Sequence, residues 1–288
     1  MRYRLPSSLI SSAIRVRDPK ETSTAVIMTN GTRTMRELLP AMIFVGLLLV
    51  GWEMWVRARD IPTYLLPPPS DLWQAFIDQR HALPVHIRTT LGEALLGLLC
   101  ASLLGVLLAG LIASVPLIRR VLYPLLVISQ NIPVLVLAPL LAVWFGFGMT
   151  PKVVIVVLIG FFPIVVNTTD GLLRADREIV ELVRSMGANR WQIFRTVLVP
   201  SAIPSFFAGL QIGAAYAVIG AVIAEWMGAS SGLGLFITRS QRAFRTDQIF
   251  MAVVVIALIS VMLFASVRLL AHFAMPWNRD GVQVTKTT

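Results

Sequence analysis

Long apolar runs separated by short polar segments fill most of the sequence after residue 37. Runs of about 20 apolar residues match the length that a helix needs to cross the hydrocarbon core of a bilayer. The sequence therefore predicts an all-α, polytopic membrane protein. The expected six transmembrane helices cover residues 38–56, 90–115, 121–147, 152–167, 204–225 and 249–272.

Two of these runs carry signs of how they pack. In the second run, small residues recur at every fourth position: Gly97, Ala101, Gly105, Ala109 and Ala113. Such a row lets another helix approach closely. The third run is interrupted by Gln130, Asn131 and Pro133. We expect a break in that helix, with its polar groups satisfied within the protein or in a water-filled cavity.

A long polar passage, residues 178–209, lies between the fourth and fifth apolar runs. Its charged and apolar residues alternate at helical spacing, which predicts two short amphipathic helices on either side of Gly187. Glycine adopts backbone conformations closed to other residues, so the two helices can meet at an angle. Pro200 and Pro204 are expected to end the second helix and to begin the next element. A solvated loop between two spans is the alternative interpretation.

Composition and charge agree with a membrane protein. Apolar residues make up 56% of the chain and charged residues 14%, and the mean hydropathy is +0.77. In a typical soluble domain, about a quarter of the residues are charged. The net charge of +10 comes mostly from arginines that flank the apolar runs. This placement favours a role in membrane orientation over nucleic-acid binding. The single cysteine, Cys100, can form no intrachain disulfide.

The distribution of basic residues predicts the orientation. If the N-terminus is cytoplasmic, most of the 25 lysine and arginine residues lie on the inner side. Both termini and residues 178–200 are then cytoplasmic. Residues 1–37 are basic and rich in serine and threonine, which predicts a disordered tail, not a signal peptide. Residues 278–288 form a short polar tail.

Two connections are expected outside. In residues 57–88, three consecutive prolines precede Ser70 and Asp71, which we interpret as the cap of a short surface helix. This helix either meets a delivery partner or braces the surface. The second connection, residues 228–248, contains the flexible sequence GASSGLG, which is able to dip back into the membrane.

The sequence offers no catalytic chemistry. It contains no Gly-x-x-x-x-Gly-Lys-[Ser/Thr] loop and no catalytic or metal-binding cluster, so we expect neither enzymatic activity nor a cofactor or metal site. Polar residues inside the spans are candidates for a solute route. They are Gln130, Asn131, Gln211 and Glu225. Hydrogen bonds between helices are the alternative for the amides, and an interfacial position at a span end is the alternative for Glu225.

The fifth run has two different sides. Gln211 and Glu225 lie within about 40° of each other around a helix. Gly209, Gly213 and Ala217 form a separate row of small residues suited to close packing. We therefore expect one side of this helix to be packed and the other to be sparsely polar.

The polar passage resembles the EAA loop of ABC importer permeases. The resemblance rests on Glu181, Gly187 and the sequence Val197-Leu198-Val199-Pro200, although Leu182 and Val183 stand where the family usually has small residues. The sequences LPPPSDLW, NIPVLVLAPLLAVWFGFG and AEWMGASSGLG are similar to those of permeases for nitrate, sulfonates, taurine and thiamine-precursor pyrimidines. The resemblance covers roughly residues 60–277.

The resemblance implies a permease domain over residues 38–277 in the inner membrane. It implies a second permease copy, cytoplasmic ABC ATPase subunits, a periplasmic or lipid-anchored solute-binding protein and no nucleic acid. The residues that it assigns to ATPase coupling are Glu181, Gly187, Ala188, Val197 and Pro200. Transport would follow alternating access. Thiamine-precursor pyrimidines or related heteroaromatics are the first expected solutes, ahead of sulfonates, taurine and nitrate.

A stand-alone secondary transporter is the alternative class of protein. It would need ionisable residues deep within the spans, and the sequence shows few of them.

Overall fold

The protein is described by a computed structural model over residues 21–276, and the described part is helical, without strands. It divides into a unit ending at Asp60 and a second unit that begins at Ile61. The first 20 residues of the expected N-terminal tail, residues 1–37, and the expected C-terminal tail, residues 278–288, lie outside the described residues.

The first unit contains helix α1, Glu21–Ala58. Its apolar part, Leu39–Ala58, is long enough to cross a membrane, as expected for the first span. The helix begins before this span and takes in residues 21–37, which the sequence analysis assigns to a tail.

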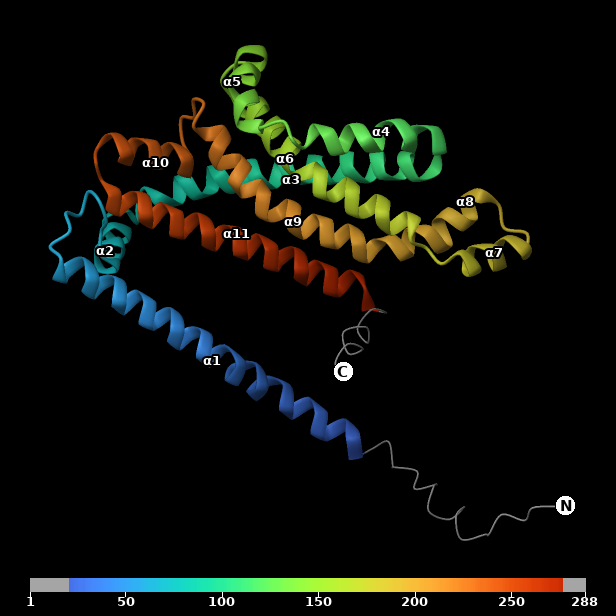
Figure 1. Ribbon diagram of the computed structural model, residues 1–288, viewed down its shortest axis with the longest axis horizontal. Coiled ribbons are helices and arrows are strands. Elements are labelled where there is room, and N and C mark those ends of the chain that lie inside the picture. The colour runs from blue at the N-terminus through green and yellow to red at the C-terminus, as the bar shows by residue number, and fades with distance from the viewer. Residues whose placement is uncertain (1–20, 277–288) are drawn as a thin grey trace, which may run out of the picture. The chain divides into compact units, whose positions relative to one another are not determined.

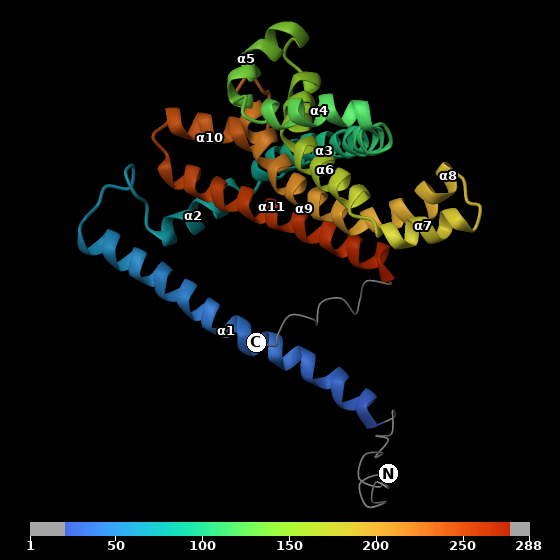
Figure 2. The same ribbon diagram turned by 45° about the vertical axis from the view of Figure 1, so that its right-hand side comes forward.

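The second unit is a bundle of long helices with short helices at its ends. Figure 1 shows α3, α6, α9 and α11 side by side, with α7 and α8 at one end and α2 and α10 at the other; Figure 2 shows the same arrangement from another side. The elements are α2 (Pro69–Gln79), α3 (Leu83–Ser114), α4 (Pro116–Ser129), α5 (Val134–Phe145), α6 (Met149–Leu173), α7 (Arg177–Ser185), α8 (Arg190–Ile193), η2 (Phe194–Leu198), α9 (Val199–Glu225), α10 (Leu233–Arg242) and α11 (Thr246–Ala274).

The six predicted spans correspond to five long apolar helices and one bent pair within the described residues. The pair is α4 and α5, which meet at 98°, as expected from the break at Gln130 to Pro133. The fourth span is longer than expected: α6 continues to Leu173. The side chains of Asn167 and Thr168 donate hydrogen bonds to carbonyls one turn earlier, so these polar residues stay inside the helix.

The row of small residues on α3 packs against α6, as the sequence predicts. Gly97 faces Val156, and Gly105 faces the side chain of Ile164. A Cβ at Gly105 would stand 2.8 Å from Cγ2 of Ile164, which is closer than real Cβ contacts come. Because glycine has no side chain, the backbones of α3 and α6 can approach each other closely at these positions.

The glycines of α9 also pack against α6. A Cβ at Gly209 would stand 2.5 Å from the carbonyl oxygen of Pro163, and one at Gly213 would stand 3.1 Å from that of Gly160. The predicted packing row of α9 is thus confirmed.

The expected sparsely polar side of α9 is wrong. Ala214, Val218 and Glu225, which lie on the side of Gln211, are buried as well, so α9 is packed on both sides.

The connection after the first span contains helix α2, as expected, but the expected cap of this helix is wrong. The helix begins at Pro69, so Ser70 and Asp71 lie in its first turn. Proline favours the first helical position because that position needs no N–H donor. Ala75 is buried, whereas Trp73 and Phe76 stack on each other and remain exposed. The helix packs through its small side against α11.

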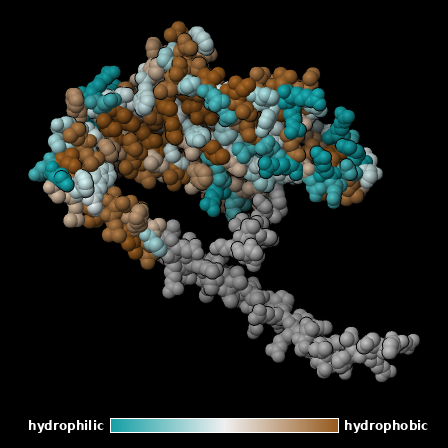
Figure 3. Space-filling model, in the orientation of Figure 1, coloured by the Kyte–Doolittle hydropathy of each residue, from teal (hydrophilic) through white to brown (hydrophobic). Residues whose placement is uncertain are grey.

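The surface of the bundle is mostly apolar along its length. Figure 3 shows hydrophobic residues over the middle of the bundle and hydrophilic residues gathered over α7 and α8. This division is the one that a membrane-spanning bundle with a polar end requires.

Candidate functional site

Helices α7 and α8 each begin at a residue that caps the helix with its side chain. Asp176 accepts a hydrogen bond from the backbone N–H of Glu178 at 2.9 Å. Asn189 and Gln192 form a reciprocal capping box, with hydrogen bonds of 2.9 and 2.8 Å. Such caps satisfy N–H groups that have no partner within the helix. Two short helices can therefore form in this polar passage.

Gly187 ends α7 in a left-handed conformation, with φ of +88°. Its N–H donates to the carbonyl of Arg184, and the N–H of Ala188 donates to that of Val183. This pair of bonds is the Schellman arrangement, which favours glycine. A Cβ at Gly187 would meet nothing within 4 Å, so the backbone angle, not lack of space, calls for glycine. The predicted pair of helices on either side of Gly187 is confirmed.

The helix pair presents unburied apolar side chains at the end of the bundle. Leu182, Met186 and Trp191 are 61%, 78% and 67% exposed, and Glu181 is exposed beside them. Large exposed apolar side chains grouped on one polar segment mark a surface for protein contact.

The other predicted coupling residues lie closer to the bundle. Val197 is buried, whereas Ala188 and Pro200 are half-buried. The segment therefore has an exposed side for contact and a buried side that anchors it.

The expectation that Pro200 and Pro204 separate two elements is wrong. Residues 190–225 form one continuous helical stretch, with Pro200 in the first turn of α9 and Pro204 inside it. The π-helical turn η2 directly precedes α9 and ends two residues before Pro200. Its wider spacing accommodates a proline ring that would collide with a carbonyl in an α-helical turn. Movements of α8 can therefore pass directly into α9.

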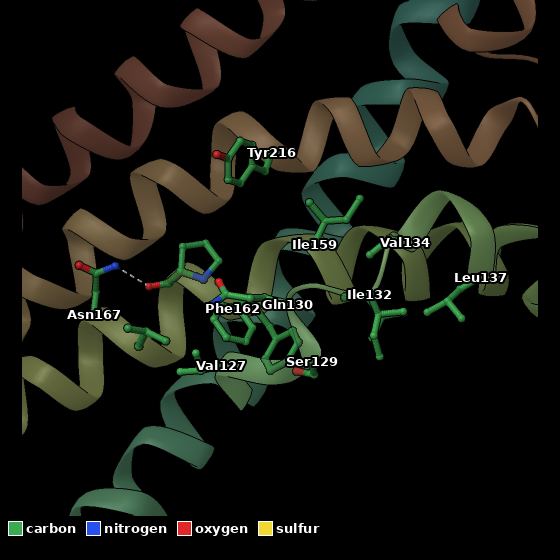
Figure 4. A pocket seen from close by; sticks show the side chains of 14 residues that line it. Val127, Ser129, Gln130, Ile132, Val134, Leu137, Ile159, Phe162, Asn167 and Tyr216 are labelled. Carbon is green, nitrogen blue, oxygen red and sulfur yellow. Dashed lines mark hydrogen bonds between the residues drawn. The ribbon is translucent and has the colours of Figure 1, made fainter. Parts of the chain in front are cut away.

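A groove of about 540 Å³ opens where α4 and α5 bend away from each other (Figure 4). Most of the lining comes from this bend and from α6, and Tyr216 contributes from α9. The polar and aromatic members of the lining are Ser129, Gln130, Phe161, Phe162, Asn167 and Tyr216. A cavity of this size with a few polar groups is suited to a small solute.

The structure places the four candidate route residues in different surroundings. Gln130 lines the groove together with Asn167. Asn131 lies outside the lining, and its amide donates to the carbonyls of Val127 and Ile128 at 3.2 and 3.4 Å. Gln211 is half-buried on α9, outside the groove lining. Neither Gln211 nor Asn131 is therefore brought together with Gln130 in the groove.

Glu225 is the last residue of α9, at the end of the span as expected, but it is buried within the bundle and is only 1% exposed. Its carboxylate accepts hydrogen bonds from the hydroxyl of Thr90 at 2.6 Å and from the N–H of Gly234. Helix α10 starts here, and the N–H groups of its first turn favour a negative charge. A Cβ at Gly232 would overlap the carboxylate, which explains a glycine in the sequence GASSGLG.

A buried ion pair next to Glu225 was not among the predicted candidates. Lys152 donates to the carboxylate of Glu93 at 2.6 Å, and their side chains are 11% and 1% exposed. Both residues also interact electrostatically with Glu225. The available signal was a charged residue within an apolar run, since Glu93 falls inside the predicted second span.

Further hydrogen bonds tie the loop after α9 to α3. The N–H of Gly232 donates to His86, the N–H of Leu233 donates to Thr90, and Thr89 contacts Ser231 at 2.9 Å. These contacts join α3, α6, α9 and α10, and one carboxylate oxygen of Glu93, Oε2, is buried without a hydrogen-bond partner. The cluster contains more buried charge than the sequence led us to expect. Lys152 and Glu93 pair with each other, and Glu225 accepts hydrogen bonds from neighbouring groups of the bundle.

The sequence also matches known proteins. A family model described as "Binding-protein-dependent transport system inner membrane component" matches residues 101–278. The chain is 40% identical over 248 residues to the formylaminopyrimidine transport permease protein ThiX of Halalkalibacterium halodurans, covering 86% of this chain and 98% of the relative. It is 37% identical over 236 residues to the riboflavin transport system permease protein RibX of Chloroflexus aurantiacus, covering 81% and 87%.

The fold resembles a solved structure, the crystal structure of an amino acid ABC transporter with histidines. The TM-score is 0.55 at 19% identity, over 70% of this chain and 97% of that one. This likeness agrees with the helical fold of the bundle. The extent of the family match and the 40% identity to a full-length permease lead to one conclusion. The chain belongs to the binding-protein-dependent transport system inner membrane components, the non-catalytic, multi-pass permease subunits of ABC importers.

Proposed function

We propose that this permease passes a small heteroaromatic solute of the pyrimidine class across the inner membrane, driven by a separate ATPase. The observation that carries the proposal is the 40% identity to a formylaminopyrimidine permease along almost its whole length. A second relative carries the name of a riboflavin permease, and riboflavin is also a heteroaromatic solute.

The chemistry of the groove supports this class of solute. Phe161, Phe162 and Tyr216 offer aromatic surface, on which a flat ring can stack. Gln130 and Asn167 carry amides, which both donate and accept hydrogen bonds, as ring nitrogens and amino groups require. Among the described residues, the groove lining contains no arginine or lysine. Sulfonates, taurine and nitrate carry an anionic group that would lack a cationic partner there.

The exposed surface of α7 and α8 supports coupling to an ATPase. Residues 178–200 would dock in a groove of that subunit, with Glu181 and the turn at Gly187 at the contact. A moving ATPase would displace this segment and, through the continuous helix 190–225, would repack the bundle around the solute. The assembly would contain two permease copies and an external binding protein, with the permease termini in the cytoplasm.

Competition for uptake tests the class of solute. Membrane vesicles containing the permease, its ATPase and its binding protein are loaded with ATP and given radiolabelled formylaminopyrimidine. We expect excess unlabelled formylaminopyrimidine to abolish uptake of label, and taurine, an alkanesulfonate and nitrate to leave it unchanged. Labelled taurine and labelled nitrate are tested in the same vesicles. Accumulation of either of them, without accumulation of the pyrimidine, would overturn the proposal and favour the anionic class.

A further inference from the structure

The corner between α3 and α4 forms a basic hollow of about 390 Å³, separate from the solute groove. Ile112 and Ala113 close it from α3. The remainder comes from one side of α4, where the lining residues recur about one turn apart: Pro116, Arg119, Arg120, Tyr123 and Pro124. The hollow thus combines an apolar floor with two cationic side chains and a phenol.

The two arginines lack an anionic partner among the described residues. Both are exposed, and neither takes part in any of the four ion pairs found there. They are adjacent in sequence and lie in the first turns of α4, where the partial positive charge of a helix N-terminus adds to theirs. An anion in the hollow would relieve this concentration of positive charge.

The surface beside the hollow is strongly apolar. Leu117, Val121 and Leu125 are 70%, 53% and 56% exposed and follow each other at four-residue spacing along α4. They form an apolar stripe next to the basic hollow. In a membrane protein such a stripe contacts acyl chains. A ligand with a negatively charged headgroup and apolar chains would fit the hollow and the stripe at the same time.

We propose that this hollow binds the phosphate of an anionic phospholipid. Arg119 and Arg120 donate to the phosphate oxygens, as guanidinium groups do in a forked geometry, and the hydroxyl of Tyr123 can add a further donor. The acyl chains lie along Leu117 and Val121. Basic pockets between transmembrane helices are known to hold such headgroups.

The position of the hollow gives the lipid a structural consequence. Ile112 and Tyr123 pack in the same apolar core as Phe194 and Leu198, which connect the α7–α8 pair to α9. A bound headgroup therefore stabilises the end of the bundle from which the helix pair projects.

Lipid titration of the full-length permease tests this site. The purified, delipidated chain in detergent is titrated with short-chain phosphatidylglycerol, phosphatidylcholine or sodium phosphate, and bound lipid is counted by native mass spectrometry. We expect selective binding of phosphatidylglycerol. The double substitution Arg119→Gln and Arg120→Gln should weaken it roughly 30-fold. The matched control, Arg239→Gln and Arg242→Gln, removes two exposed arginines from α10 and should leave binding unchanged.

Several outcomes would overturn the proposal. One is equal binding of phosphatidylcholine, and another is equal loss of binding in the control. Sodium phosphate that binds as tightly as the lipid would show a free anion site instead. A photoreactive phosphatidylglycerol probe supplies a measurement on the unsubstituted chain: we expect labelling of residues 112–125, and labelling confined to other segments would contradict the site.

Discussion

At the scale of single residues, Gly187 shows that the sequence can predict an unusual backbone conformation. Its φ of +88° is closed to most residues, and no neighbouring atom restricts the space around it. Asparagine tolerates this conformation, whereas a β-branched residue does not. Substitution here therefore separates backbone strain from side-chain volume.

We predict that Gly187→Val inserts in the membrane but uncouples ATP hydrolysis from uptake, and that Gly187→Asn retains coupling. The left-handed angle costs valine about 1–2 kcal/mol, so the turn between α7 and α8 opens. Hydrolysis and uptake are measured together in vesicles that contain the partner ATPase. Normal uptake by Gly187→Val would show that the turn angle does not matter for coupling.

Gln130 tests the assignment of the groove to the solute route. Its amide faces the groove, so Gln130→Leu should lower uptake or change the selectivity while complex yield stays normal. Gly213→Leu is the packing control: a side chain there meets the carbonyl of Gly160 and should prevent assembly. Gln211→Leu, outside the groove lining, should transport better than Gln130→Leu. If Gln130→Leu takes up solute as the parent does, the groove is not part of the route.

The two residues that sequence reasoning missed, Glu93 and Lys152, lie far apart in the chain, and so does the predicted candidate Glu225, next to which they are buried. Glu93 and Lys152 are 59 positions apart, and Glu225 belongs to a third helix. Each looks like an isolated charge near a span end. Only the packing of α3 against α6 and α9 brings them together, and this packing depends on glycine contacts whose partners a single sequence does not reveal.

At the scale of elements, the buried Glu93–Lys152 pair holds α3 against α6. Lys152→Met should lower thermal stability by roughly 3–5 kcal/mol, because it leaves a buried carboxylate without its partner. Adding Glu93→Gln should recover much of the loss. Thermal unfolding of the detergent-purified chain measures both effects.

The exposed pair of Arg174 and Asp170 serves as the comparison. Its atoms are 3.9 Å apart and its side chains are 82% and 40% exposed, so Arg174→Gln should cost less than about 1 kcal/mol. Equal destabilisation by Lys152→Met and Arg174→Gln would contradict the role of the buried pair.

Helices were easier to predict than their ends. The apolar runs and the break near Pro133 followed from hydropathy and from proline chemistry. The extension of α6 depends on Asn167 and Thr168 bonding back to their own helix, and the passage through Pro200 depends on a π-helical turn. Residue types alone predict neither feature, because asparagine, threonine and proline also occur frequently at the ends of helices.

At the scale of the whole molecule, the orientation is a prediction from charge. In a Cys100→Ala background, Ser185→Cys should react with a membrane-impermeant maleimide only from the cytoplasmic side. Ser230→Cys should react only from outside. Both serines are exposed within this chain. Labelling of position 185 from outside would contradict both the orientation and the proposed ATPase contact.

The source of energy distinguishes an ABC importer subunit from a stand-alone transporter most directly. Proteoliposomes containing the permease, its ATPase and its binding protein are given labelled formylaminopyrimidine, with ATP or with a proton gradient alone. We predict uptake only when ATP and the binding protein are both present, and none by the permease alone. Uptake by the purified permease under a proton gradient, without ATP, would contradict the account.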